Sequence, residues 1–347
     1  MNLLDNCLDD LQRRIDEPRE AQRERAWLEF LDGRCPTDEF FPPERPPSPP
    51  RIAWPKPRVN ETLEDFEAML LQQFRGVSDV LEHGWRSVLS VRSNYGTGIL
   101  PTLFGCELFR MEDQQDTLPA ARPLGSADDI RRLLDRGMPD LDAGLGQRTF
   151  ECGHRLQETL ARFPMLERWV WLYHPDVQGP IDVAEVVWGS DMFYAFYEDP
   201  TLLKDFLTLV TDTYIAFLRR WFEIVPQKTP YAAHWGLMHK GTIMLRNDSL
   251  MNLSPQAYVD FVRPMDERCF DAFGGGAIHF CGRCEHFLEP MSHCRGLTAI
   301  NMGQPYMNDP ETICRHSVDK GIQIVGLFGE LPRSGGGTLR GLAHRQG

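Results

Sequence analysis

Apolar positions near the start of the chain recur at helical spacing. Leu4, Leu8, Leu11 and Ile15 predict a first helix, and a second helix opening at Pro18 carries Trp27 and Phe30 on one stripe. Prolines are then concentrated in residues 36–57, which predicts an extended, polyproline-like connector. Residues 1–57 are therefore expected to form an N-terminal helical arm followed by a proline-rich connector.

Helical stripes and short apolar runs alternate through the rest of the chain. Helices are predicted over 61–83, after Ser126 and after Asp199, and the apolar runs at 87–91 and 169–173 have strand length. Toward the C-terminus, strands at 242–246, 277–281, 297–300 and 322–327 alternate with helices, including one over 255–273. This order is typical of parallel βα units. An α/β fold is therefore predicted, a (β/α)8 TIM barrel over 58–347 with an N-terminal helical extension.

Charge and cysteine content narrow the partners and the compartment. The formal net charge of −13 disfavours nucleic acid and anionic membrane surfaces. The nine cysteines are an odd number with no regular framework, so reduced thiols are expected. The first residues lack the pattern of a secretory signal, and no apolar run reaches the length of a membrane span. A cytoplasmic protein is therefore expected.

His279 and Cys281 stand two residues apart at the end of the strand predicted at 277–281. Because side chains at i and i+2 of a strand point to the same face, the imidazole and the thiol are expected side by side. Both are zinc ligands. The alternative is that the pair is buried and only packs, since free cysteines are among the most buried residues.

Other polar residues follow the predicted strands, where the active sites of TIM barrels lie. Each of them taken singly is also explained as a turn former or a helix cap. Their shared position instead predicts one site, with catalytic roles for Asp176 and Asp248 and substrate-binding roles for Tyr95, Gln178, Arg283, Asn301 and Gln304.

Three segments together resemble the uroporphyrinogen decarboxylase (URO-D) superfamily. They are His174 to Phe193, Asn247 to Pro255 and Ile278 to Arg283, and the resemblance extends over roughly residues 85 to 330. His-x-Cys at a strand end is closest to its corrinoid-dependent, zinc-containing methyltransferases. That branch implies a TIM barrel in which zinc binds a thiol substrate as thiolate, and the thiolate takes a methyl group from a corrinoid that a partner protein is expected to carry.

The family pattern implies His279 and Cys281 as the first two zinc ligands. It takes a third ligand, a cysteine, from near the last strand, but 322–332 contains no cysteine. Cys284, which forms Cys-x-x-Cys with Cys281, is the expected substitute; Cys294 and Glu330 are poorer candidates.

Two other functions stay open. A lyase that decarboxylates a uroporphyrinogen-like tetrapyrrole would match the superfamily, although the loop after the first barrel strand offers only Arg86 and Arg92 for the many carboxylates of such a substrate. The third possibility is a non-catalytic module that binds a corrinoid protein through the arm and connector.

Overall fold

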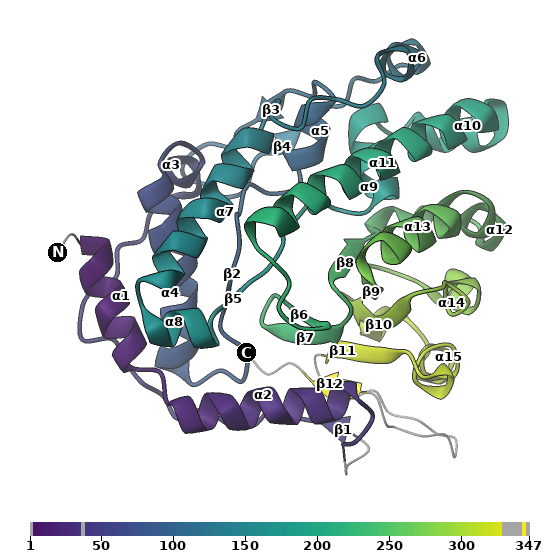
Figure 1. Cartoon of the computed structure of the whole chain (residues 1–347). Helices are drawn as coiled ribbons and strands as arrows, with labels where there is room; N and C mark the ends of the chain where they lie inside the picture. Colours follow the sequence, from purple (N-terminus) through teal and green to yellow (C-terminus); the bar gives the residue numbers. More distant parts are fainter. Residues whose placement is uncertain (1–2, 36–38, 328–341, 345–347) are drawn as a thin grey trace.

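The computed structural model describes residues 3–35, 39–327 and 342–344 and shows a mixed α/β fold in which helices surround parallel strands (Figure 1). The two helices of the predicted arm are confirmed as α1 and α2. The helices are α1 Leu3–Arg13, α2 Glu17–Leu31, α3 Val59–Glu64, α4 Phe66–His83, α5 Ile99–Leu103, α6 Ala127–Arg136, α7 Gly146–Ala161, α8 Pro164–Trp169, α9 Pro180–Trp188, α10 Met192–Glu198, α11 Pro200–Ile224, α12 Pro255–Ala257, α13 Arg263–Phe273, α14 Glu285–Met291 and α15 Pro310–Arg315.

The strands form one large sheet and three pairs. They are β1 Glu39–Phe40, β2 Ser90–Val91, β3 Leu108–Phe109, β4 Ala120–Ala121, β5 Trp171–Leu172, β6 Tyr231–His234, β7 Leu237–Lys240, β8 Ile243–Arg246, β9 Gly276–Phe280, β10 Leu297–Met302, β11 Gln323–Leu327 and β12 Leu342–His344. The large sheet has the order β1-β12-β11-β10-β9-β8, with parallel neighbours throughout. β2 pairs with β5 in parallel, whereas β3–β4 and β6–β7 are antiparallel.

The four predicted C-terminal strands are confirmed as β8, β9, β10 and β11. Over the described residues the strand pairs do not join into a continuous cylinder, so the parallel α/β sheet is observed and the closed eightfold barrel stays a prediction. None of the described helices combines the length and the apolar character needed to cross a membrane.

Proline positions explain two differences from the predicted elements. Trp169 ends helix α8 and does not start a strand, because Pro164 at the first helical position opens a short helix over this apolar stretch. The helix predicted over 255–273 contains a π-helical turn at Tyr258–Val262. Pro264 explains this turn, because it has no N–H to donate to the preceding turn of the helix.

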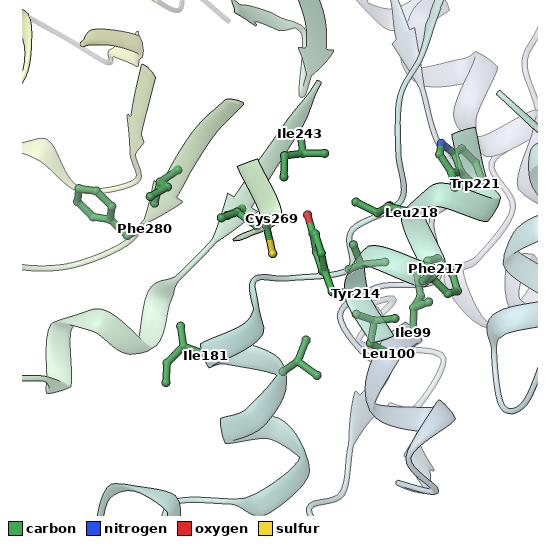
Figure 2. Close-up of a cluster of buried hydrophobic side chains, with 14 of the residues drawn as sticks. Ile99, Leu100, Ile181, Tyr214, Phe217, Leu218, Trp221, Ile243, Cys269 and Phe280 are labelled. Carbon is green, nitrogen blue, oxygen red and sulfur yellow. The ribbon is translucent and has the colours of Figure 1, made fainter. Parts of the chain in front are cut away.

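One face of the large sheet packs against the surrounding helices. Figure 2 shows part of this buried cluster, which includes Ile243 of β8 and Phe280 of β9. They lie with Tyr214 and Leu218 of α11 and with Cys269 of α13. Burial of these large side chains stabilises the packing of the helices on this face of the sheet, by about 25 cal/mol per Å² of apolar area removed from water.

The opposite face packs against the β6–β7 hairpin and the N-terminal arm. Small or flexible side chains on β8 to β11, namely Met244, Ala277, Ala299 and Val325, form a second cluster with Leu237 and Met238 of β7 and with Trp27 and Phe30 of α2. In Figure 1 the hairpin lies on the inner side of the sheet, beside β11 and above α2. Gly326 of β11 has φ 80°, and an added Cβ would lie 2.5 Å from Cδ1 of Leu237 and 2.6 Å from Nδ2 of Asn301, so glycine suits both the backbone conformation and this close approach.

A buried ion cluster ties the arm and the connector to the rest of the chain. Glu20 of α2 accepts hydrogen bonds from Arg23 at 2.8 Å and from two nitrogens of Arg45 at 2.9 and 2.8 Å. Arg45 also donates to the carbonyls of Trp85 and Ser87, just before β2. The arm is therefore integrated into the fold, and whether residues 1–57 form a separate folding unit stays a prediction.

Replacing Glu20 with alanine should lower the free energy of unfolding by about 3 to 5 kcal/mol, because two buried guanidinium groups lose their counter-charge. Glu24→Ala is the matched control, since Glu24 pairs with Arg168 at the surface and its loss should cost about 1 kcal/mol or less. Urea denaturation of the full chain measures both; equal effects would show that the buried cluster does not anchor the arm.

Candidate metal centre

Three neighbouring strands place three polar side chains in one row. Arg246 at the end of β8 pairs in register with His279 on β9, and His279 pairs with Asn301 on β10. Each lies two residues after Met244, Ala277 or Ala299, which face the hairpin. Because side chains alternate along a strand, the polar row forms the next layer on the same face, toward the carboxyl ends of the strands.

Asn301 determines how the imidazole of His279 is oriented. The amide nitrogen of Asn301 donates to the carbonyl of Val325 at 2.6 Å, which leaves its oxygen for Nδ1 of His279, also at 2.6 Å. Since an amide oxygen only accepts, Nδ1 carries the proton and Nε2 carries the lone pair. An outer hydrogen bond of this kind is what fixes the tautomer of a metal-binding histidine.

The lone pair of His279 faces a thiol and a carboxylate. Nε2 lies 3.6 Å from Sγ of Cys281 and 3.7 Å from Oδ1 of Asp248, and all three ligand atoms are within 4.8 Å of one another. A tetrahedral Zn²⁺ with bonds of about 2.0 to 2.3 Å separates its ligand atoms by about 3.3 to 3.8 Å. Among the described residues, Oδ1 of Asp248 is buried and has no hydrogen-bond partner, as expected of a ligand atom. The donor set therefore fits a metal with three protein ligands and one open position.

Burial sets the protonation of these ligands. Desolvation lowers the pKa of His279, so the imidazole is neutral and able to ligate near pH 7. Burial, together with the negative charge of Asp248, raises the pKa of Cys281 to about 11. The thiol is therefore protonated at neutral pH, and a binding metal ion must displace its proton.

A second carboxylate, Asp182 at the start of α9, holds Asp248 in place. It accepts hydrogen bonds from the backbone N–H groups of Asp248 and Ser249, both at 2.9 Å, and from the Ser249 hydroxyl at 2.6 Å. Burial raises the pKa of Asp182 to about 7, although these hydrogen bonds act to lower it. Asp182 therefore fixes the backbone that presents the third ligand.

Arg246 and Trp235 form the wall beside the three ligands. The guanidinium of Arg246 lies 5.0 Å from the ring centre of Trp235, and the Trp235 ring packs edge-on against His279 at 5.0 Å. Trp235 occupies the tip of the β6–β7 hairpin with φ 49°, a left-handed conformation that is costly for a tryptophan. The fold thus holds an indole at the ligand group despite local strain.

The predicted catalytic residue Asp176 lies beside this wall. Its carboxylate forms ion pairs with Arg246 and, at 3.3 Å, with Arg92. One negative charge therefore faces two positive charges, and a net positive charge remains. In the same loop Gln178 adopts a left-handed backbone, φ 61°, and its buried side-chain oxygen has no hydrogen-bond partner in the part of the chain that the structure describes. An unpartnered polar atom in this loop is consistent with substrate binding, which stays a prediction.

Of the other residues predicted to bind substrate, Gln304 and Arg283 lie in or against the loop after Cys281, and Tyr95 lies in the core. Gln304 accepts a hydrogen bond from the Gly282 N–H at 2.8 Å and so braces the loop after Cys281, and Arg283 in that loop is exposed. Tyr95 is fully buried, with its hydroxyl beside Cys152 and Arg148, and its role in substrate binding stays a prediction.

The structure places Asp248, and not Cys284, beside His279 and Cys281. The chain turns at Gly282, where φ is 82°, and the thiol of Cys284 then points into the core at the start of α14. The Cys284 N–H donates to Asn308 at 2.7 Å, which keeps it there. Cys294 is also buried in the core, and Glu330 lies outside the described residues.

Sequence reasoning did not identify Trp235, Arg246 or Asp182 as parts of this centre. Trp235-Gly236 stands between two short β-prone runs and so carried a hairpin signal, and Arg246 directly precedes the segment that contains Asp248. Nothing in the sequence around Asp182 separates it from an ordinary acidic residue at the start of a helix.

Gly303→Ala should weaken Zn²⁺ binding by about tenfold or more. A Cβ at residue 303 would lie 2.6 Å from Sγ of Cys281 and must displace the thiol, and misplacing a ligand by such an amount is costly. Gly76→Ala is the control, because nothing lies within 4 Å of its added Cβ. Titration of metal-free protein with Zn²⁺ against a competing chelator measures both affinities; an unchanged affinity in Gly303→Ala contradicts the assignment of Cys281.

Asp182 should make stability depend on pH. Its folded-state pKa, about 7, lies above the unfolded value near 3.8, so the folded chain binds the extra proton between these two values. Stability from this group is therefore present below about pH 4 and is lost as pH rises toward 7, by up to about 1.4 kcal/mol per pH unit. Urea denaturation of metal-free protein at pH 5 and pH 7 should show a steeper loss for the natural chain than for Asp182→Asn.

No protein-family model matches the sequence, and no curated protein matches it. Among solved structures, the chain is similar to a methyltransferase from Methanosarcina mazei, with a TM-score of 0.57 and 15% sequence identity. The similarity covers 78% of this chain and 72% of the methyltransferase. At this identity the likeness shows the fold, and the protein therefore has a methyltransferase-like α/β fold.

Proposed function

We propose that the protein is a zinc-dependent methyltransferase that transfers a methyl group from a corrinoid to a thiol. The observation that carries the proposal is the convergence of Asp248, His279 and Cys281 within 4.8 Å on the carboxyl ends of β8 and β9. The fold shared with a methanogen methyltransferase supports the same reaction class. The resemblance of the His-x-Cys segment to the methyltransferase branch of the URO-D superfamily supports the choice of a thiol acceptor.

In this proposal Asp248, His279 and Cys281 hold the metal. Zn²⁺ bound there would supply a Lewis acid that keeps the substrate thiol in its nucleophilic thiolate form. Asn301 keeps the His279 lone pair directed at the metal position, and Asp182 holds the backbone of Asp248. Trp235 covers one side of His279.

The surface beside this centre suits a partner that delivers the methyl group. Met251, Tyr306 and Met307 are exposed by 45%, 81% and 39%. Met251 touches the loop after Cys281, since a Cβ on Gly282 would lie 2.7 Å from its methyl carbon, and Tyr306 and Met307 follow Gln304 in the loop after β10. A corrinoid-carrying protein is the partner that the proposed reaction requires.

The decarboxylase alternative receives less support from the site. Asp176 neutralises part of the charge of Arg92 and Arg246, and Arg86 pairs with Glu44 of the connector. A substrate with many carboxylates needs several unpaired cations to offset its desolvation. No observation favours the non-catalytic alternative over an enzyme.

Purified protein should contain about one Zn²⁺ per chain by elemental analysis. His279→Ala, Cys281→Ser and Asp248→Ala should each weaken Zn²⁺ binding by more than about 100-fold, because changes to outer-shell partners alone cost about 10 to 100-fold. Cys284→Ser is the matched control and should keep the metal, since its thiol is buried outside the ligand group.

The reaction itself is tested with methylcobalamin and simple thiols, with mass spectrometry used to detect the methylated thiol. The zinc-loaded natural chain should form product, and Cys281→Ser should form at least about 100-fold less. Absence of stoichiometric zinc in the natural chain, or loss of zinc only in Cys284→Ser, would reject the ligand assignment.

A further inference from the structure

Three histidines lie buried together outside the metal centre. His234 at the end of β6 packs against His174 with ring centres 4.3 Å apart and against His239 of β7 at 5.0 Å. Their exposed fractions are 3%, 4% and 0%. Burial lowers the pKa of His174 and His239 to about 4 and that of His234 well below its usual value, so all three rings are neutral. The proposed reaction uses none of them.

Backbone groups at two ends of this cluster determine which nitrogen of each ring is protonated. Nδ1 of His239 faces the Lys240 carbonyl at 3.0 Å, and a carbonyl only accepts, so Nδ1 carries the proton and Nε2 the lone pair. Nδ1 of His234 lies 2.9 Å from that lone pair and must therefore donate to it. His174 is determined independently: its Nε2 accepts from the Met244 N–H and its Nδ1 donates to the Pro175 carbonyl.

This arrangement leaves one lone pair without a partner. Because His234 donates through Nδ1, its Nε2 is an acceptor, and this atom is buried with no hydrogen-bond partner among the described residues. Leaving a buried acceptor unsatisfied costs free energy that a native fold rarely retains without a use. Two successive hydrogen bonds, from His234 to His239 and from His239 to the Lys240 carbonyl, thus keep the proton of His234 on Nδ1 and leave its Nε2 as an acceptor.

The surroundings of His234 limit what this acceptor can bind. Tyr173 packs edge-on against the ring at 5.0 Å, and Arg92, 5.9 Å over Tyr173, adds a positive charge that further lowers the pKa of His234. A cation is disfavoured beside Arg92, and an anion is repelled by a lone pair. A neutral O–H or N–H donor satisfies both conditions.

We propose that Nε2 of His234 is a binding position for a neutral hydroxyl or N–H group, supplied by a bound organic ligand or by an internal water molecule. Trp235 connects this position to the metal centre, since its ring lies 6.3 Å from His234 and 5.0 Å from His279. The inference does not depend on zinc or on methyl transfer.

The test uses the full chain labelled with ¹⁵N-histidine, and ¹⁵N NMR reports the protonation of each ring nitrogen. All three buried histidines should carry the proton on Nδ1 at pH 7. The probe is 4-fluorophenol, and its matched control is 4-fluoroanisole, which has the same ring and no O–H. If an organic ligand supplies the donor, 4-fluorophenol shifts the His234 Nε2 signal and 4-fluoroanisole does not.

Two variants separate binding from folding. His234→Phe should weaken 4-fluorophenol binding about tenfold or more, and His239→Leu should weaken it by several-fold, because the orientation of the His234 proton is no longer enforced. His286→Phe, at an exposed site, should change nothing. Cys281→Ser should also leave the response intact, which distinguishes failure of this inference from failure of the proposed function.

A His234 Nε2 signal that is already hydrogen-bonded without probe, together with magnetisation transfer from water, would assign the position to internal water. Protonation of His234 on Nε2, or a free Nε2 that responds to neither water nor probe, would overturn the inference.

Discussion

The register between β8, β9 and β10 is the constraint on which the site depends. It sets Arg246, His279 and Asn301 side by side, so that an amide can orient an imidazole and a guanidinium can lie next to it. A slip of one residue in β9 would turn His279 toward the helices and bring Ile278 or Phe280 to the interior face. Such a slip is opposed by the outer core, because Ile278 and Phe280 are fully buried against the helices. Apolar packing on one face of the sheet therefore fixes the chemistry on the other.

The interior hairpin links this register to the rest of the molecule. Ala277 and Ala299 are small enough for β6 and β7 to lie against the sheet, and α2 covers the hairpin from below. The same hairpin carries His234 on β6 and His239 on β7. Trp235 lies in the turn between these two strands and packs against His279. The arm, the hairpin and the ligand group are thus successive layers, and the buried Glu20 cluster holds the outermost layer in place.

Two histidines of the interior, His279 and His234, are both neutral but differ in what they can bind. Desolvation keeps His279 and His234 neutral, and in each ring a hydrogen bond at Nδ1 leaves the lone pair on Nε2. The lone pair of His279 faces a thiol and a carboxylate, a set suited to a metal ion, whereas the ring of His234 packs against Tyr173 and is subject to the positive charge of Arg92. Identical side chains thus acquire different binding properties from their neighbours. The difference arises from charge and donor count, not from the imidazole itself.

The sequence by itself predicted the two helices of the arm, the four strands β8 to β11 and the pairing of His279 with Cys281. Periodicity predicted the arm and β8 to β11, and the two-residue spacing of His279 and Cys281 predicted a shared face, because both signals depend only on local backbone geometry. The third ligand was decided by tertiary structure. Cys284 is near Cys281 in sequence, but the turn at Gly282 directs it into the core, while strand pairing and Asp182 bring Asp248 to the site. The buried histidines and Trp235 likewise depend on a hairpin whose position inside the sheet is set by packing between distant segments, which no local pattern encodes.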